Sequence, residues 1–190
     1  MRDIVKVKFA KVHPDAVIPS KRDEDMGFDI YACFDEDYII INPHETKLIP
    51  TGIASACDPD YGFVLFERGS TGSKGIARRC GVIDSGYRNE WFIGLTNTTD
   101  HHLYISKLSK EELVEQENKK FREMFGALGD MSSTMFGSHW DIDIIYPYSK
   151  AIAQALVVPV PKISVEELSY EELKNIKSER GMGALGSSNK

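Results

Sequence analysis

The residues from Gly81 to Glu90 carry the clearest signs of chemistry in this chain. Val82-Ile83 leads into Asp84, and Ser85-Gly86 follows as a tight turn. This order predicts a β-hairpin whose tip holds one carboxylate in a fixed place. A fixed carboxylate can position and polarise a water nucleophile, so Asp84 is a candidate catalytic residue. An acid at a hairpin tip is also a common turn residue, and both interpretations stay open on this motif alone.

Two segments rich in Gly and Ser, each led by an arginine, flank this hairpin in the sequence. The first runs from Arg68 to Gly75 and the second from Arg180 to Ser188. Small residues leave backbone N–H groups accessible, and a guanidinium offers a fork of donors to phosphate oxygens. The first segment does not fit the P-loop pattern, because Lys74 is followed by Gly75. With the hairpin, the segments predict a pocket for a phosphorylated small molecule. Taken singly, each could also be a surface loop or an ordinary terminus.

Composition narrows the class of protein. The formal net charge is −6, which argues against a nucleic-acid or anionic-membrane partner. The three cysteines lie far apart with no C-x-x-C pair, as expected for reduced thiols. The first residues are charged and alternating, unlike a signal peptide, and no apolar run has membrane-spanning length. We therefore expect a cytoplasmic protein.

Short apolar or alternating stretches, separated by Pro, Gly and Asn, recur along most of the chain and predict β-strands. They are found at 4–12, 27–32, 38–41, 47–54, 61–66, 91–96 and 155–160. Many short strands with this punctuation indicate an all-β fold, either a sandwich, a barrel or a jelly roll. A chain of 190 residues is expected to form a single domain, 1–190.

Two capping boxes predict helices. Ser109-x-x-Glu112 precedes apolar residues at helical spacing and predicts a helix near 110–128, while Ser169-x-x-Glu172 predicts a shorter helix near the C-terminus. The stretch 97–149 otherwise has little strand signal. Because such a long connection is unusual inside a compact β domain, we expect an inserted, partly helical segment there.

In this order, the motifs resemble those of the homotrimeric dUTPase family, the dUTP diphosphatases. The resemblance covers residues 1–97 and 150–190 and leaves out the segment 97–149, which separates the third and fourth motifs. The five family motifs correspond to Gly27–Ile30, Arg68–Ser70, Gly81–Glu90, Ile152–Gln154 and Arg180–Ser188. Five motifs in order make the resemblance specific, whereas any one of them would not be.

The resemblance implies a dUTPase-like jelly roll, or distorted β-barrel, that forms a homotrimer with three shared active sites. It also implies Mg²⁺-dependent hydrolysis of dUTP to dUMP and diphosphate. Asp84 would orient the water that attacks the α-phosphorus, and Tyr87 would pack against the deoxyribose and exclude ribonucleotides. The main chain of Gly81, Val82 and Ile83 would read the uracil edge.

The remaining motifs would hold the phosphates and the metal. By the same resemblance, Asp29 would support the metal ion through water, and residues 178–190 would form a flexible tail that closes over the substrate. The residues expected at the phosphates are Arg68, Gly69, Ser70 and Gln154, and those expected in the tail are Arg180, Leu185, Gly186, Ser187 and Ser188. This chain departs from the family pattern at Gly69, where a Ser is usual, and at Leu185, where a Phe stacks on the uracil.

Two other functions remain to be weighed. The dCTP deaminases share the fold, but they carry a catalytic Glu ten residues after the hairpin Asp, and here that position is Gly94. The alternative from another class is a regulatory protein of the dUTPase fold that binds a protein partner through the insert at 97–149. An insert that only thickens the scaffold is an equally open interpretation.

Overall fold

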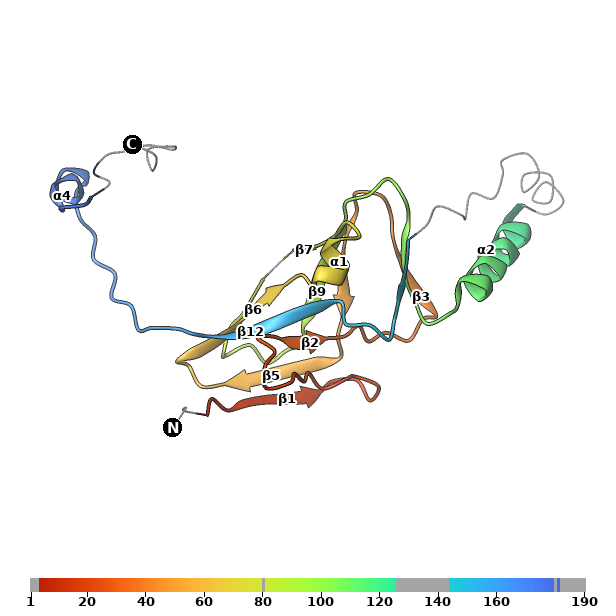
Figure 1. Cartoon of the computed structure of the whole chain (residues 1–190), viewed down its shortest axis with the longest axis horizontal. Coiled ribbons are helices and arrows are strands. Elements are labelled where there is room, and N and C mark those ends of the chain that lie inside the picture. Colours follow the sequence, from red (N-terminus) through yellow and green to blue (C-terminus); the bar gives the residue numbers. More distant parts are fainter. Residues whose placement is uncertain (1–3, 80, 126–143, 180, 182–190) are drawn as a thin grey trace. The chain divides into compact units, whose positions relative to one another are not determined.

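Short strands are the main regular secondary structure in the computed structural model, which describes residues 4–79, 81–125, 144–179 and 181 (Figure 1). Two compact units are distinguished, Met1–Val160 and Pro161–Lys190. The first contains every strand. Its elements are β1 (Val7–Lys11), β2 (Phe28–Ile30), β3 (Tyr38–Ile41), β4 (Thr46–Pro50), β5 (Ile53–Cys57), β6 (Tyr61–Phe66), α1 (Gly69–Gly72), β7 (Ile76–Arg79), β8 (Val82–Ile83), β9 (Phe92–Asn97), β10 (Leu103–Ser106), α2 (Lys110–Phe125), β11 (Ile144–Pro147) and β12 (Ala153–Pro159).

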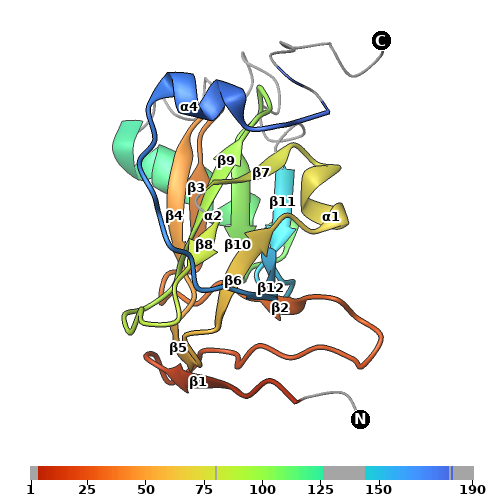
Figure 2. The same ribbon diagram turned by 90° about the vertical axis from the view of Figure 1, so that its left-hand side faces the viewer.

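Four small sheets pack together in this unit (Figure 2). Their strand orders are β1-β5, β11-β10-β3, β2-β12-β6-β8 and β4-β9-β7. Every pairing is antiparallel except that of β10 with β11, which is parallel. The sheets do not close into a continuous barrel. This all-β, jelly-roll-like architecture confirms the fold class expected from the strand pattern.

Aromatic side chains from separate sheets meet in one core. The rings of Phe63 on β6 and Trp91 have centroids 5.0 Å apart, and Phe9 on β1 lies 5.8 Å and 5.7 Å from them. The indole N–H of Trp91 donates to Ser55 Oγ at 3.2 Å, so its polar atom is satisfied inside the core. Because the core is shared, these sheets position one another.

The segment 97–149 contains strands that the sequence patterns did not indicate. β10 is completely buried, and β11 contributes the buried side chain of Tyr146. Both strands belong to the sheet of β3, so part of this segment is built into the β fold. Sequence reasoning missed both strands, because it assigned the whole segment 97–149 to an inserted, partly helical connection.

Helix α2 lies where the first capping box places it. Glu112 N–H donates to Ser109 Oγ at 3.2 Å, and Ser109 N–H donates back to Glu112 Oε2 at 2.9 Å. The Tyr38 hydroxyl hydrogen-bonds with both Glu117 and Lys120, which ties the helix to β3. Residues 126–128 of the expected helix lie outside the described residues.

The second unit contains α4 (Tyr170–Asn175), which begins at the Ser169 capping box. Within the parts of the chain that the structure describes, no helix is long and apolar enough to cross a membrane.

Candidate functional site

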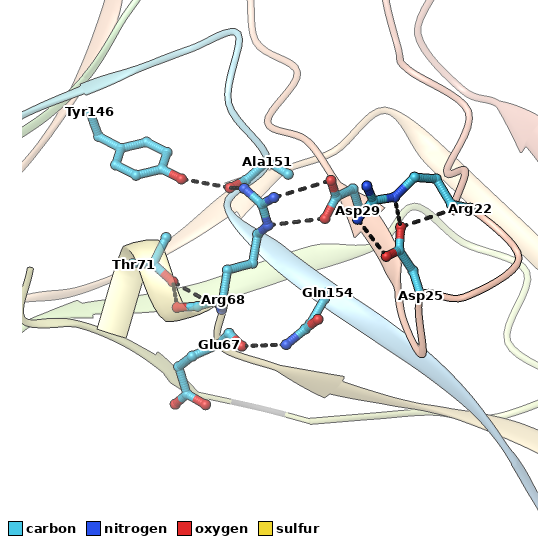
Figure 3. A network of polar contacts seen from close by, with 9 residues as sticks. All are labelled: Arg22, Asp25, Asp29, Glu67, Arg68, Thr71, Tyr146, Ala151 and Gln154. Atoms are coloured by element: carbon cyan, nitrogen blue, oxygen red, sulfur yellow. Dashed lines mark hydrogen bonds and ion pairs between the residues drawn. The ribbon is translucent and has the colours of Figure 1, made fainter. Parts of the chain in front are cut away.

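A cavity of about 730 Å³ opens where the loop 20–27 faces the end of β6 and the start of β12. Three basic and two acidic side chains share this cavity with several small and polar residues. Figure 3 shows two of the basic residues, Arg22 and Arg68, with the acidic residues Asp25 and Asp29. Its lining consists of Ser20, Lys21, Arg22, Asp25, Met26, Gly27, Asp29, Arg68, Gly69, Ser70 and Gln154.

An ion pair between Arg68 and Asp29 forms the centre of the cavity wall. Arg68 Nε lies 3.0 Å from Asp29 Oδ1, and Nη2 lies 3.3 Å from Oδ2, so the guanidinium meets the carboxylate with two nitrogens. Arg68 Nη1 also donates to the carbonyl of Ala151 at 3.3 Å. That carbonyl accepts from the buried Tyr146 hydroxyl at 2.7 Å, so this acceptor of the guanidinium is held in place.

The sheet β2-β12-β6 brings these side chains together. Gln154 on β12 stands opposite Asp29 on β2 and also opposite Phe66, the last residue of β6. Its side-chain amide donates to the carbonyl of Glu67 at 2.8 Å, next to Arg68. Residues from three distant parts of the sequence therefore converge through strand register rather than through loop conformation.

The short helix α1 turns the chain directly after Arg68. Arg68 N–H donates to the Thr71 hydroxyl at 3.1 Å, and that hydroxyl donates to the Arg68 carbonyl at 2.9 Å. Gly69 and Ser70 line the cavity, and a methyl group added at Gly69 would meet nothing within 4 Å. Backbone and hydroxyl donors of α1 are thus open to the cavity, as phosphate recognition requires.

The segment Gly81–Glu90, called the hairpin from its predicted form, contains the expected turn but is not a two-stranded β-hairpin, because among the described residues β8 pairs only with β6 and residues 84–91 form no strand. The segment is anchored on two sides. β8 pairs with β6, and Leu65 N–H donates to the Gly81 carbonyl at 2.7 Å. Asp84 begins the turn, because its carbonyl accepts from Tyr87 N–H at 3.1 Å. At the far end, Glu90 Oε1 accepts from Gly52 N–H at 2.7 Å.

The two sets of candidate residues do not line the same cavity in the described part of the chain. Asp29, Arg68, Gly69, Ser70 and Gln154 line the cavity, whereas no residue from Gly81 to Tyr87 belongs to its lining. The tail residues expected at the phosphates, namely Arg180, Leu185, Gly186, Ser187 and Ser188, lie outside the described residues.

Sequence reasoning missed the loop residues that share the cavity. These residues are Ser20, Lys21, Arg22, Asp25 and Met26, and none of them was a candidate from the sequence. The available signal was the basic pair Lys21-Arg22, just upstream of the first motif.

The sequence of this chain is similar to those of known proteins of one family. A family model described as dUTPase matches residues 14–110. The deoxyuridine 5'-triphosphate nucleotidohydrolase of Neisseria meningitidis (serogroup A) is 31% identical over 111 residues, covering 53% of this chain and 73% of that protein. The protein of the same name from Nautilia profundicola is 28% identical over 190 residues, covering 98% of this chain and 100% of its own.

Solved structures show the same fold. A mutant dUTPase of Staphylococcus bacteriophage 80alpha, solved with dUpNHpp, superposes with a TM-score of 0.65 and 17% identity, over 96% of this chain and 98% of the phage chain. The native EIAV dUTPase superposes with a TM-score of 0.55 and 19% identity, over 87% of this chain and 98% of its own.

The fold defines an all-β protein of the jelly-roll class. Since the family model matches half of its residues, the chain belongs to the dUTPase family.

The geometry at Gly94 bears on the deaminase alternative. Gly94 lies on β9 opposite Arg79, and a Cβ atom at this position would lie 2.9 Å from the Arg79 carbonyl oxygen. A glutamate could be placed here only with a shift of the backbone, so the position does not suit the catalytic Glu of a dCTP deaminase.

Proposed function

We propose that this protein hydrolyses dUTP to dUMP and diphosphate by attack of water on the α-phosphate. The observation that carries the proposal is the cavity in which Arg68, Asp29 and Gln154 converge, in a chain of the dUTPase family. Phosphoryl transfer depends mainly on positioning and on neutralising charge, and this cavity offers a fixed guanidinium, an amide and the open N-terminal turn of α1.

In this proposal the cavity residues bind the phosphates. Arg68, Ser70 and Gln154 hold phosphate oxygens, with Gly69 allowing close approach of the backbone. Asp29 is positioned by Arg68 and is half-exposed, so it can hold a metal-bound water. The oxygen donors suit Mg²⁺, which keeps several waters and binds substrate phosphates. Within the described residues no cluster of three or more His, Cys, Asp or Glu side chains could hold a metal. This fits indirect support by Asp29. When bound, Mg²⁺ would neutralise charge on the phosphate oxygens.

The hairpin supplies the nucleophile and the nucleoside contacts. Asp84 orients the attacking water, Tyr87 packs against the deoxyribose, and the main chain of Gly81 to Ile83 reads the uracil edge. The Tyr87 hydroxyl donates to the Glu90 carbonyl at 3.0 Å, so its ring is already held in place. Closure of the tail residues Arg180 and Leu185–Ser188 over the substrate remains a prediction.

A second copy of the chain is proposed to complete the site. Because the hairpin does not line the cavity of its own chain, Asp84 must come from another protomer if both halves act on one substrate. A homotrimer with three such shared sites satisfies this requirement by cyclic symmetry.

The first experiment measures diphosphate release in the presence of Mg²⁺ from dUTP, dCTP, dTTP and UTP. We expect turnover of dUTP alone and loss of turnover in Asp84→Asn, because the amide cannot accept the proton of water. Chelation of Mg²⁺ should also abolish the activity. A wild-type protein that turns over none of the four nucleotides would contradict the proposal.

A binding role for the insert is a second candidate function. It is favoured by the way α2 is held on β3 through Tyr38 while Met124 near its end is 74% exposed. Such a fixed helix with an exposed apolar residue could present a surface to a protein partner.

A further inference from the structure

The loop from Ser20 to Gly27 contributes two of the three basic residues that line the cavity. Lys21 and Arg22 lie there with Arg68, opposite Asp25 and Asp29. A nucleoside triphosphate carries three phosphate groups, and Arg68 by itself presents one fork of donors. Two further cations on the same cavity wall therefore need an explanation.

Arg22 is held in the loop by Asp25. Its Nε donates to Asp25 Oδ2 and its Nη2 to Oδ1, both at 2.8 Å, while Arg22 N–H donates to Oδ2 at 3.2 Å (Figure 3). The Arg22 side chain is nevertheless 87% exposed. Exposed ion pairs exchange their partners at little cost, so a phosphate can replace the carboxylate on this guanidinium.

Lys21 reinforces the same turn. Its Nζ donates to the Arg22 carbonyl at 3.1 Å and to the Asp25 carbonyl at 2.8 Å, and it lies 6.0 Å from the centroid of the Phe28 ring. The ammonium is thereby kept beside Arg22 rather than extended into solvent.

The loop is fixed against the residues proposed to bind phosphate. Asp29 N–H donates to the Ser20 carbonyl at 3.2 Å, and Gly27 lies so close to Gln154 that an added Cβ would be 3.2 Å from Gln154 Oε1. Both basic residues are therefore presented to the cavity from a wall that directly contacts the Arg68 half.

We propose that Lys21 and Arg22 form a second phosphate subsite, which binds the outer phosphates of a nucleoside triphosphate whose inner phosphate is held at Arg68. The inference rests on the proposed function and deepens it. On binding, the phosphate oxygens replace the Asp25 carboxylate as hydrogen-bond acceptors of the Arg22 guanidinium. The subsite also offsets the loss of a hydroxyl at Gly69, and it favours a triphosphate over a shorter chain.

A double-mutant cycle on Arg22 and Asp25 tests this subsite, because removing the two charges should change the KM for dUTP in opposite directions. Arg22→Gln should raise the KM for dUTP by about tenfold, as loss of one charge-assisted contact would. Asp25→Asn should leave KM unchanged or lower it, since it frees Arg22 for the phosphate. The double variant should behave like Arg22→Gln, and Lys119→Gln on the exposed face of α2 should behave like wild type.

The inference is overturned if Arg22→Gln leaves KM unchanged, or if Arg22→Gln and Asp25→Asn raise it equally. Equal effects would mean that the pair only shapes the loop. Thermal melting of each variant shows whether it is folded, and Arg22→Lys, which keeps the charge, should recover part of the affinity.

Direct binding separates this inference from the proposed hydrolysis. Calorimetry with inorganic tripolyphosphate should show weaker binding to Arg22→Gln than to wild type, with pyrophosphate less affected. If wild type hydrolyses no nucleotide but tripolyphosphate binding still depends on Arg22, the proposed function fails and the subsite stands. If wild type hydrolyses dUTP and neither KM nor tripolyphosphate binding depends on Arg22, the subsite alone fails.

Discussion

Paired charges are the main feature of the cavity at the scale of single residues. Arg68 is matched with Asp29 and Arg22 with Asp25, so each guanidinium already has a carboxylate at 2.8–3.3 Å. A ligand phosphate must exchange with Asp25 at Arg22, whereas Arg68 still has N–H donors that Asp29 and the Ala151 carbonyl do not use. Exchange of one anion for another preserves the hydrogen bonds of the guanidinium, which keeps the cost of binding low.

The titration of Asp25 reports on this pairing. Hydrogen bonds from the side chain and backbone of Arg22 lower the pKa of Asp25 from an ordinary 3.8 to about 2. Because the pKa is lowered in the folded protein, the stabilising pair is fully present above the ordinary value and is lost as pH falls through about 2. We expect carboxyl ¹³C NMR to place the Asp25 midpoint near 2, and Arg22→Gln to return it toward 3.8. Identical midpoints in the two proteins would show that Arg22 is not the cause.

The sequence predicted some residues of the cavity and not others. Asp29, Arg68 and Gln154 stand in ordered motifs, and strand register then brings them together. Lys21 and Arg22 lie outside these motifs, and charged residues in a loop are usually only solvated, so they were not candidates. Their proximity to Gln154 depends on the close approach at Gly27, which no local sequence pattern encodes.

At the scale of secondary-structure elements, the main feature is the packing of helix α2 against the β-sheet unit. Leu113 is buried, Gln116 donates to Asp37 at 2.9 Å, and Lys120 lies 4.5 Å from the centroid of the Tyr38 ring. The helix is therefore docked on β3 from its first turn to its third.

Removal of the α2 cap should loosen this docking. Ser109→Ala removes the acceptor for Glu112 N–H and should cost about 1 kcal/mol of helix stability. Faster hydrogen exchange at the start of α2 would be the measured effect. Ser169→Ala is a matched control, because it removes the same capping contact from α4, which has no buried residues. Its exchange should change only at α4, and an unchanged α2 in Ser109→Ala would contradict the role of the cap.

Among the secondary-structure elements, helices were easier to predict from the sequence than strands. Both capping boxes mark helix starts in the structure, because a cap is a local contact between residues three apart. The strands β10 and β11 are only four residues long, and their parallel pairing joins residues about forty positions apart, as in Leu103 with Ile144. Such a pairing depends on the assembled core, so the sequence pattern alone could not indicate it.

Sharing of the active site between protomers is the main prediction for the whole molecule. Arg68→Gln and Asp84→Asn proteins should each be inactive alone. Mixed trimers, formed by dissociating and reassociating the two, should recover up to about a quarter of wild-type activity, since one site in four then receives both intact halves. Mass spectrometry of the intact trimers verifies the mixing. Inactive mixed trimers would mean that both halves act within one chain.

The connection 107–143 should be dispensable for catalysis. β10 and β11 are parallel, so any replacement must run back along the strand, and about a dozen Gly and Ser residues are needed. We expect a variant with 108–143 replaced in this way to keep kcat/KM for dUTP within about twofold, because none of the described residues of this segment, 108–125, lines the cavity. Loss of catalysis in a folded variant would show that the insert helps to build the site.

The pairing of charges in the cavity also affects how substrate arrives. The chain has a formal net charge of −6, and its paired cations project little positive potential beyond the cavity. An anionic nucleotide is therefore not steered from a distance and is recognised only at contact. Salt screens the repulsion between the negatively charged chain and the nucleotide, so it should not slow the encounter, in contrast to proteins whose exposed cations attract phosphates through solution. The charge-assisted contacts formed after the encounter weaken with salt, so ionic strength should raise the rate of dissociation more than it lowers the rate of association.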